Sequence, residues 1–212
     1  MIIVFEGLDN AGKTTLAEKL EVSLIKDGYD VNYTREFQTP VGLLIKELYG
    51  QGKMDATMKS YLFAADRHMR LLQCIGDYRR SERWKEEIKS KVIIFDRYYQ
   101  SAVAYRKAEG IDANWIEVIN SIFPEPDLAF YLDITPETSI SRNSDAKFNF
   151  IYSKEFLGRV REQYLSMNMI KIDGENVLPD DLFCLIEKMI KKHLTACKFP
   201  RICEDPEKES IV

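Results

Sequence analysis

The chain has 212 residues, of which 45% are hydrophobic and 30% are charged, and its formal net charge is −4. This composition is typical of a globular protein and argues against wholesale disorder, and the length suits one domain with a substantial core. The negative charge argues against a broad nucleic-acid surface. No apolar run approaches the ~20 residues that span a bilayer, and no basic leader precedes the first apolar run. We therefore expect a soluble cytoplasmic protein that binds neither nucleic acid nor membrane.

Short apolar runs alternate with helix-length amphipathic segments, which is typical of a parallel α/β sheet. We predict strands at 2–6, 31–36, 91–95, 127–132 and 169–172. We predict helices at 13–27, 41–50, 57–79, 82–89, 98–108, 112–121, 136–142, 153–167 and 180–194. In the third helix, the spacing of Leu62, Ala65, Met69 and Leu72 predicts the buried stripe.

The domain organisation follows from these elements. We expect a single domain over 1–194. Residues 195–212 contain Pro200, Pro206 and a charged run, so we expect a tail that is either an ordered extension or a partner contact. The four cysteines form no Cys-x-x-Cys pair, which favours reduced thiols over a metal site. They are Cys74, Cys184, Cys197 and Cys203.

The stretch from Gly7 to Thr14 directly follows the first predicted strand and matches the pattern G-x-x-x-x-G-K-[ST]. Gly7 and Gly12 permit the positive φ and the close backbone approach that side chains would block. Successive backbone N–H groups, with the positive end of the next helix behind them, can then bind phosphate. Lys13 would reach the β- and γ-phosphates of a nucleotide, and the Thr14 hydroxyl would be a ligand of Mg²⁺. A glycine-rich turn without function would not require Lys-Thr after Gly12.

Charged residues also follow three later strands, and ligands of open parallel sheets bind beyond the carboxyl ends of the strands. Arg35 lies at the end of the second strand, Asp96 and Arg97 follow the third, and Asp133 follows the fourth. Asp96 would be either an indirect partner of Mg²⁺ or only a cap of the next helix. A cation such as Arg97 at a helix N-terminus costs ~0.3–1 kcal/mol, which favours an anion bound beside it.

Two further rows of residues suggest a pocket for a phosphorylated small molecule. Arg97, Ser101 and Tyr105 are spaced i, i+4 and i+8, so we expect them on one helix face. Phe63 and Arg67 are one turn apart in the 57–79 helix. An isolated pair of this kind is more often a core ring and a solvated surface charge. Opposite a phosphate loop, however, the ring could stack on a base and the guanidinium could bond its edge.

Five stretches resemble the thymidylate kinase family and follow the family's order. They are the Gly7–Thr14 loop, Thr34-Arg35-Glu36, Leu62 through Arg67, Asp96-Arg97-Tyr98 with Ser101 and Ala104-Tyr105, and Pro126-Asp127-Leu128 through Tyr131-Leu132-Asp133. The resemblance extends from Ile2 to about Leu165. It implies a three-layer α/β nucleoside monophosphate kinase fold with a central five-stranded parallel sheet. It also implies Mg²⁺-dependent transfer of the γ-phosphate of ATP to dTMP, and a homodimer packed through helices.

The resemblance also implies roles for single residues. Phe63 would stack on thymine, Arg67 would donate to the base edge, and Tyr105 would crowd the sugar C2′ position. By position, the ATP site would comprise Gly7, Leu8, Asp9, Asn10, Ala11, Gly12, Lys13, Thr14 and Thr15, and the metal site Thr14 and Asp96. The dTMP site would comprise Asp9, Arg35, Phe63, Arg67, Arg97, Ser101 and Tyr105, with Arg35 and Arg97 on the phosphate. The expected catalytic residues are Lys13, Arg97, Asp9, Arg142 and Lys147.

The chain departs from the family pattern in two places. Its lid, about 143–152, is poor in arginine, so Arg142 and Lys147 remain the candidates for the cation that closes over ATP. Near the acceptor, Arg106 stands where a neutral polar residue is common, and Ala102 lacks an amide that some relatives present to the base. Two alternatives therefore stay open: a related kinase with a different or broader acceptor, and a catalytically weak nucleotide-binding protein. A GTP-dependent switch is disfavoured because no Asn-Lys-x-Asp follows a strand.

Overall fold

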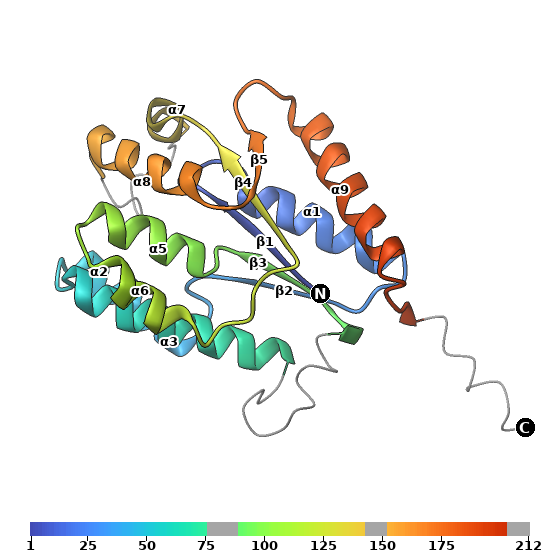
Figure 1. The fold of residues 1–212 in the computed structure, drawn as a ribbon, viewed down its shortest axis with the longest axis horizontal. Coiled ribbons are helices and arrows are strands. Elements are labelled where there is room, and N and C mark those ends of the chain that lie inside the picture. Colours follow the sequence, from blue (N-terminus) through green and yellow to red (C-terminus); the bar gives the residue numbers. More distant parts are fainter. Residues whose placement is uncertain (76–88, 143–151, 203–212) are drawn as a thin grey trace, which may run out of the picture.

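A computed structural model describes residues 1–75, 89–142 and 152–202. Five strands form one sheet in the order β2-β3-β1-β4-β5, and every neighbouring pair is parallel. They are β1 (Ile2–Gly7), β2 (Val31–Arg35), β3 (Val92–Asp96), β4 (Leu128–Asp133) and β5 (Ile170–Asp173). Helices cover both faces of the sheet (Figure 1). The predicted α/β fold with a central five-stranded parallel sheet is confirmed.

The helices lie close to their predicted ranges. They are α1 (Lys13–Lys26), α2 (Pro40–Gly50), α3 (Ala56–Ile75), α5 (Tyr99–Ala108), α6 (Ala113–Asn120), α7 (Pro136–Ser141), α8 (Lys154–Ser166) and α9 (Pro179–Ala196). The predicted helix at 82–89 falls almost wholly outside the described residues. Four of the helices begin at a side chain that accepts a backbone N–H of the first turn, which fixes their starts. These caps are Thr39, Asp112, Thr135 and Ser153.

The central strand β1 is buried on both faces, as expected where helices cover both sides of a parallel sheet. On one face, Phe5 and its stacked neighbour Phe130 belong to a core with apolar side chains of α1 and α9. On the other face, Val4 packs with Leu71 and Ile75 of α3. The two cores hold the strand ends in place, so the loops at the carboxyl edge start from fixed points.

The predicted buried stripe of α3 is wrong. Ala65 is exposed, and Leu62, Met69 and Leu72 are only partly buried. The buried positions lie about half a turn away, and they are Ser60, Asp66, Arg67, Arg70, Leu71, Cys74 and Ile75. Charged side chains are seldom fully buried unless they are paired, so a stripe of this kind requires partners on the facing elements.

The described residues of the predicted tail contact the segment that follows α1. After α9 ends, the ring of Phe199 lies 6.3 Å from that of Tyr29, and the backbone N–H of Ile202 donates to the carbonyl of Gly28 at 2.7 Å. Residues 203–212 lie outside the described ranges, and Cys203 with them. Cys74, Cys184 and Cys197 are free thiols.

None of the helices in the described ranges is long and apolar enough to cross a lipid bilayer.

Candidate active site

The loop between β1 and α1 has the backbone that its glycines predict. Gly7 has a φ of 149°, and a Cβ there would lie 2.7 Å from the carbonyl oxygen of Leu132. Gly12 is the N-cap residue of α1, and its φ of 93° lies in the left-handed region. Asn10 also has a positive φ, and its amide donates to the carbonyl of Ser139 at 3.0 Å. Ser139 belongs to α7, the helix that follows β4, so this contact holds the exposed tip of the loop.

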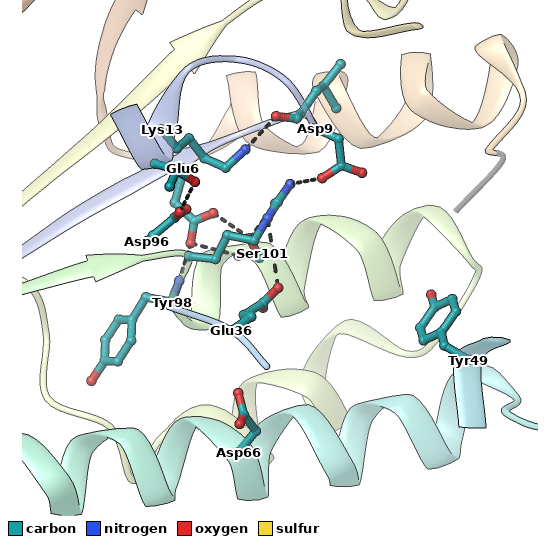
Figure 2. Close-up of polar contacts among 12 residues, drawn as sticks. Glu6, Asp9, Lys13, Glu36, Tyr49, Asp66, Asp96, Tyr98 and Ser101 are labelled. Carbon is teal, nitrogen blue, oxygen red and sulfur yellow. Dashed lines mark hydrogen bonds and ion pairs between the residues drawn. The ribbon is translucent and has the colours of Figure 1, made fainter. Parts of the chain in front are cut away.

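Lys13 and Thr14 both lie at the start of α1 and point toward the carboxyl edge of the sheet. Lys13 is buried, and its ammonium group donates to the carbonyl of Leu8 at 2.6 Å (Figure 2). Burial lowers the pKa of Lys13 to about 8, and Arg97 nearby adds to this effect. Thr15, on the next position, is exposed. A bound polyphosphate would give the Lys13 ammonium an anionic partner that the loop carbonyl does not provide.

Asp96 does not cap the following helix, contrary to one of the two expectations. Tyr98 occupies the N-cap position of α5, and its side chain accepts no hydrogen bond from the first turn of the helix. Asp96 instead accepts a hydrogen bond from the hydroxyl of Thr14, with 2.5 Å between Oγ1 and Oδ2. The two oxygens therefore lie side by side at the first turn of α1.

The prediction that Arg97 shares a helix face with Ser101 and Tyr105 is wrong, because Arg97 lies outside α5. It has a φ of 66° and precedes the helix. From there its Nη1 donates to Ser101 at 3.0 Å, and the guanidinium lies 5.5 Å from the ring centre of Tyr105. Its Nη2 lies 2.5 Å from Oδ1 of Asp9. Burial by itself raises the pKa of Asp9, but Arg97 and Lys13 outweigh it and hold that pKa below its ordinary value.

Glu6, the residue before the last in the buried strand β1, is a site residue that the sequence analysis missed. Its carboxylate is fully buried and accepts hydrogen bonds from the backbone N–H groups of Tyr98 and Ser101, at 2.8 and 3.1 Å. It also accepts from the hydroxyls of Ser101 and Tyr164, at 2.5 and 3.1 Å. Glu6 thereby places a negative charge at the N-terminus of α5, and this charge offsets the unfavourable positive charge of Arg97 there. The signal available in the sequence was a carboxylate near the end of an otherwise apolar strand.

A second group missed from sequence joins α3 to Arg97 and explains the polar stripe of that helix. Arg70 donates from Nη1 to the backbone carbonyl of Arg97 at 3.1 Å, and its Nε lies 3.2 Å from Oδ2 of Asp66. Asp66 also accepts from the hydroxyl of Thr39 at 2.6 Å, and that hydroxyl caps α2. Figure 2 shows Asp66 pointing from α3 toward the phosphate-binding loop, with Glu36 lying between Asp66 and that loop. These buried charges support the positive-φ turn that carries Arg97.

Two cavities meet at Arg97. One, of about 1020 Å³ with its open mouth, is lined by the loop, the start of α1 and the end of β2, and it includes Lys13 and Arg35. The other, of about 600 Å³, is lined by α3, α5 and the segment after β2, and it includes Phe63. Asp9, Glu36, Phe37 and Arg97 line both.

In the smaller cavity, Phe63 is partly buried and its ring lies 6.0 Å from that of Phe37 in an edge-to-face arrangement. Arg67 is 1% exposed, so the alternative of a solvated surface charge is wrong. Its Nη1 donates to Asn120 at 2.7 Å, and burial lowers the pKa of Arg67 to about 10. The structure therefore places a ring and a buried guanidinium in one wall.

Two charged residues from the end of β2 differ in their surroundings. Arg35 is exposed at the mouth of the larger cavity, with 3.7 Å between its Nη1 and the carboxylate of Glu18. Glu36 faces inward, and its carboxylate lies 3.9 Å from Nε of Arg97. Burial raises the pKa of Glu36 to about 7, although Arg97, Arg70 and Arg67 oppose the shift.

The expected lid cations are only partly described. Arg142 is exposed at the end of α7, and its Nη2 donates to the carbonyl of Gly174 at 3.1 Å. Lys147 lies outside the described residues. Of the two arginines in α8, Arg161 forms a two-pronged ion pair with Asp133, at 2.7 and 2.9 Å, and so is already engaged.

Comparison with known proteins agrees with this geometry. The sequence model of the family described as thymidylate kinase matches residues 5–178. A probable thymidylate kinase of Sulfurisphaera tokodaii is 37% identical over 89% of this chain and 93% of its own length. Probable thymidylate kinase 1 of Saccharolobus solfataricus is 40% identical, covering 78% of this chain and 82% of its own. A probable thymidylate kinase of Staphylothermus marinus is 34% identical, over 91% and 95%. The chain therefore belongs to the thymidylate kinase family.

Proposed function

We propose that this chain transfers the γ-phosphate of ATP to dTMP, giving ADP and dTDP. The observation that carries the proposal is the meeting of the two cavities at Arg97, with the phosphate-binding loop on one side and Phe63 on the other. A triphosphate on the loop and a nucleoside monophosphate in the smaller cavity would bring their phosphates together beside that guanidinium. Phosphoryl transfer requires this arrangement, because it is catalysed mainly by positioning and by neutralising charge.

The reaction would need no nucleophile from the protein. A phosphate monoester has its second pKa near ~6, so its own oxygen is ready to attack near neutral pH. That oxygen forms a bond to the γ-phosphorus of ATP, and the bond from this phosphorus to the β–γ bridging oxygen breaks. ADP leaves with the bridging oxygen and its electron pair. Lys13 on the donor side and Arg97 on the acceptor side would neutralise the negative charge that shifts between them.

The residues present fit a magnesium ion as part of this proposal. Thr14 Oγ1 and Asp96 Oδ2 are hard oxygen donors 2.5 Å apart at the loop. Mg²⁺ is commonly held by one or two such protein groups together with substrate phosphates and water. A bound Mg²⁺ would neutralise charge on the β- and γ-phosphates. Arg142 and Lys147 remain our candidates for the cation that closes over ATP.

The proposal includes a second copy of the chain as partner. Large apolar side chains are exposed on α2, α3, α6 and the residues just after α6, which Figure 1 shows on one side of the molecule. Tyr61 of α3 is 57% exposed and lies edge-on to Trp115 of α6, and Val118 is 69% exposed. The others are Leu43, Leu44, Met58 and Ile122. A patch of this kind in a folded protein usually marks an interface. Light scattering on the purified chain should give twice the monomer mass.

A panel of acceptors tests the activity. With ATP and Mg²⁺, release of ADP should depend on dTMP and exceed that with UMP, dCMP or thymidine. A clear preference for UMP or for unphosphorylated thymidine would replace dTMP with another acceptor. No turnover with any acceptor, although ATP binds, would leave a nucleotide-binding protein without the proposed activity.

A further inference from the structure

Three charged residues form a cluster at one end of the smaller cavity. Lys59 of α3 lies 2.8 Å from Oε1 of Glu109, and Arg106 of α5 lies 2.7 Å from its Oε2. The side chains of Lys59, Arg106 and Glu109 are 15%, 5% and 14% exposed. Two cations therefore share one carboxylate in a largely buried place, and both cations line the cavity.

This cluster lies at the end of the cavity away from Arg97. Arg70, which contacts the backbone of Arg97, is eleven residues beyond Lys59 in α3, a separation of roughly 16 Å along a helix. The ammonium of Lys59 lies 5.0 Å from the ring centre of Tyr49, and Figure 2 shows Tyr49 well away from Asp9 and Glu36. A monophosphate whose phosphate is held at Arg97 would direct its base toward this end.

Ala102 leaves room in front of Arg106. The two residues are one turn apart in α5, and both line the cavity. A longer side chain at 102 would take up space in the cavity that both residues line. The short side chain and the added cation are therefore complementary.

The pairing with Glu109 leaves Arg106 incompletely satisfied. Nη1 of Arg106 and Oε2 of Glu109 are close, but neither has a hydrogen-bond partner of acceptable geometry among the described residues. A buried N–H without a partner is costly, so a carbonyl oxygen supplied by a ligand would gain more here than at an exposed site. Lysine and arginine offer only donors, which matches the carbonyl oxygens of a pyrimidine such as thymine.

We infer that Arg106, held by Glu109 beside Lys59, is a specificity-determining residue that donates to a carbonyl oxygen of the acceptor base. This rests on the proposed function, because it takes the smaller cavity to be the acceptor site. The plain alternative is an ion-pair cluster that only joins α3 to α5. Such a cluster would affect stability, but it would not respond to single-atom changes in the base.

A double substitution of protein and ligand separates the two. The binding of dTMP, 2-thio-dTMP and 4-thio-dTMP is measured without ATP in the wild type and in Arg106→Met, since sulfur is a weak acceptor. In the wild type, one of the two thio-nucleotides should bind about tenfold more weakly than dTMP. In Arg106→Met, dTMP itself should bind about tenfold more weakly, and that thio penalty should fall below about twofold. The nucleotide that shows the coupling identifies the carbonyl.

The matched control is Lys107→Met, which removes the same charge from the next residue of α5. Lys107 pairs with Glu117 at 3.6 Å and does not line this cavity. It should leave all three affinities and the thio penalty unchanged. If Arg106→Met fails to fold, as judged by its denaturation midpoint, Arg106→Lys serves in its place. That variant keeps the charge on Glu109 but loses the fork, and it should reduce the penalty partly.

The inference is overturned if both thio penalties are the same in the wild type and in the Arg106 variant. It is also overturned if the wild type binds none of the three nucleotides. Failure of the proposed function looks different, because binding is measured without ATP. Coupling of Arg106 to one carbonyl, with no transfer from ATP to dTMP, would remove the activity and keep the role of Arg106.

Discussion

Nη2 of Arg97 lies 2.5 Å from Oδ1 of Asp9, and this ion pair joins the phosphate-binding loop to the turn between β3 and α5. Both side chains line both cavities. An acceptor phosphate beside Arg97 would therefore share that guanidinium with Asp9. The positive φ of Arg97 and the hydrogen bond from Arg70 to its carbonyl hold Arg97 where its guanidinium can pair with Asp9 or with a bound phosphate.

The first prediction concerns this guanidinium. Replacement of Arg97 by Met should lower kcat/KM for dTMP by about 10²–10³, because it removes a charged donor that acts on the transferring phosphate. ATP affinity should change by less than about threefold, since Lys13 and the loop amides remain. Steady-state kinetics and ATP titration measure the two effects. Arg97→Lys, which keeps the charge but not the fork, should lie between the two proteins. Normal turnover in Arg97→Met would contradict the site.

The second prediction follows from the buried ammonium of Lys13. Burial lowers its pKa to about 8, so about half of the unliganded protein lacks this proton at pH 8. Phosphate oxygens stabilise the charged form, so ATP binding should raise that pKa and take up about half a proton per site at pH 8. Calorimetric titrations in two buffers of different ionisation enthalpy measure the uptake.

Lys13→Arg is the control for proton uptake, because arginine stays protonated throughout this pH range. It should bind ATP with uptake near zero at pH 8. Equal uptake in the two proteins would show that another group takes the proton.

The third prediction concerns stability and pH at Glu36. Burial raises its folded pKa to about 7 from an ordinary value of 4.5, with Arg97 and Arg70 lowering it and Asp66 raising it further. Between these values the folded protein holds a proton that the unfolded chain has released. Unfolding free energy should therefore fall as pH rises from about 5 to about 8, by roughly 3 kcal/mol at most for this group.

Glu36→Gln removes this titration and leaves the other groups in place. Denaturant unfolding at pH 5 and at pH 8 should show a smaller decrease for the variant than for the wild type. Parallel curves for the two proteins would mean that Glu36 is ionised in the folded state across the whole range.

The fourth prediction compares two glycines within helices. A Cβ on Gly42 of α2 would lie 2.6 Å from Oδ1 of Asp66 and 2.6 Å from the Cα of Phe37. Gly42→Ala should therefore destabilise the fold by about 1–3 kcal/mol, as overpacking does. Gly158 of α8 has no atom within 4 Å of the corresponding position, so Gly158→Ala should stabilise by about 0.5–1 kcal/mol. Thermal unfolding of both variants checks the opposite signs.

Patterns of a few residues could be read from the sequence because local physics decides them. The glycine spacing between Gly7 and Gly12 predicts a backbone that only glycine adopts easily, and that backbone is present. The alternation of apolar runs with amphipathic segments likewise predicts the parallel sheet. Most helix and strand ranges follow from the same periodicity.

The buried face of α3 and the position of Arg97 depended on contacts between distant segments. Periodicity selected the apolar residues of α3, but the structure buries Asp66 and Arg70 because Thr39 and the Arg97 carbonyl pair with them. Arg97 reaches Ser101 from outside the helix, through a left-handed turn that no helical spacing describes.

The sequence by itself determined that this protein has a phosphate-binding loop on a parallel α/β sheet, because hydrogen-bonding geometry and glycine conformation act over a few neighbouring residues. Only the tertiary structure decided which charges are buried and which face the cavities. A buried charge is stable only with a partner, and partners such as Glu6 and Tyr164 are 158 residues apart in the chain.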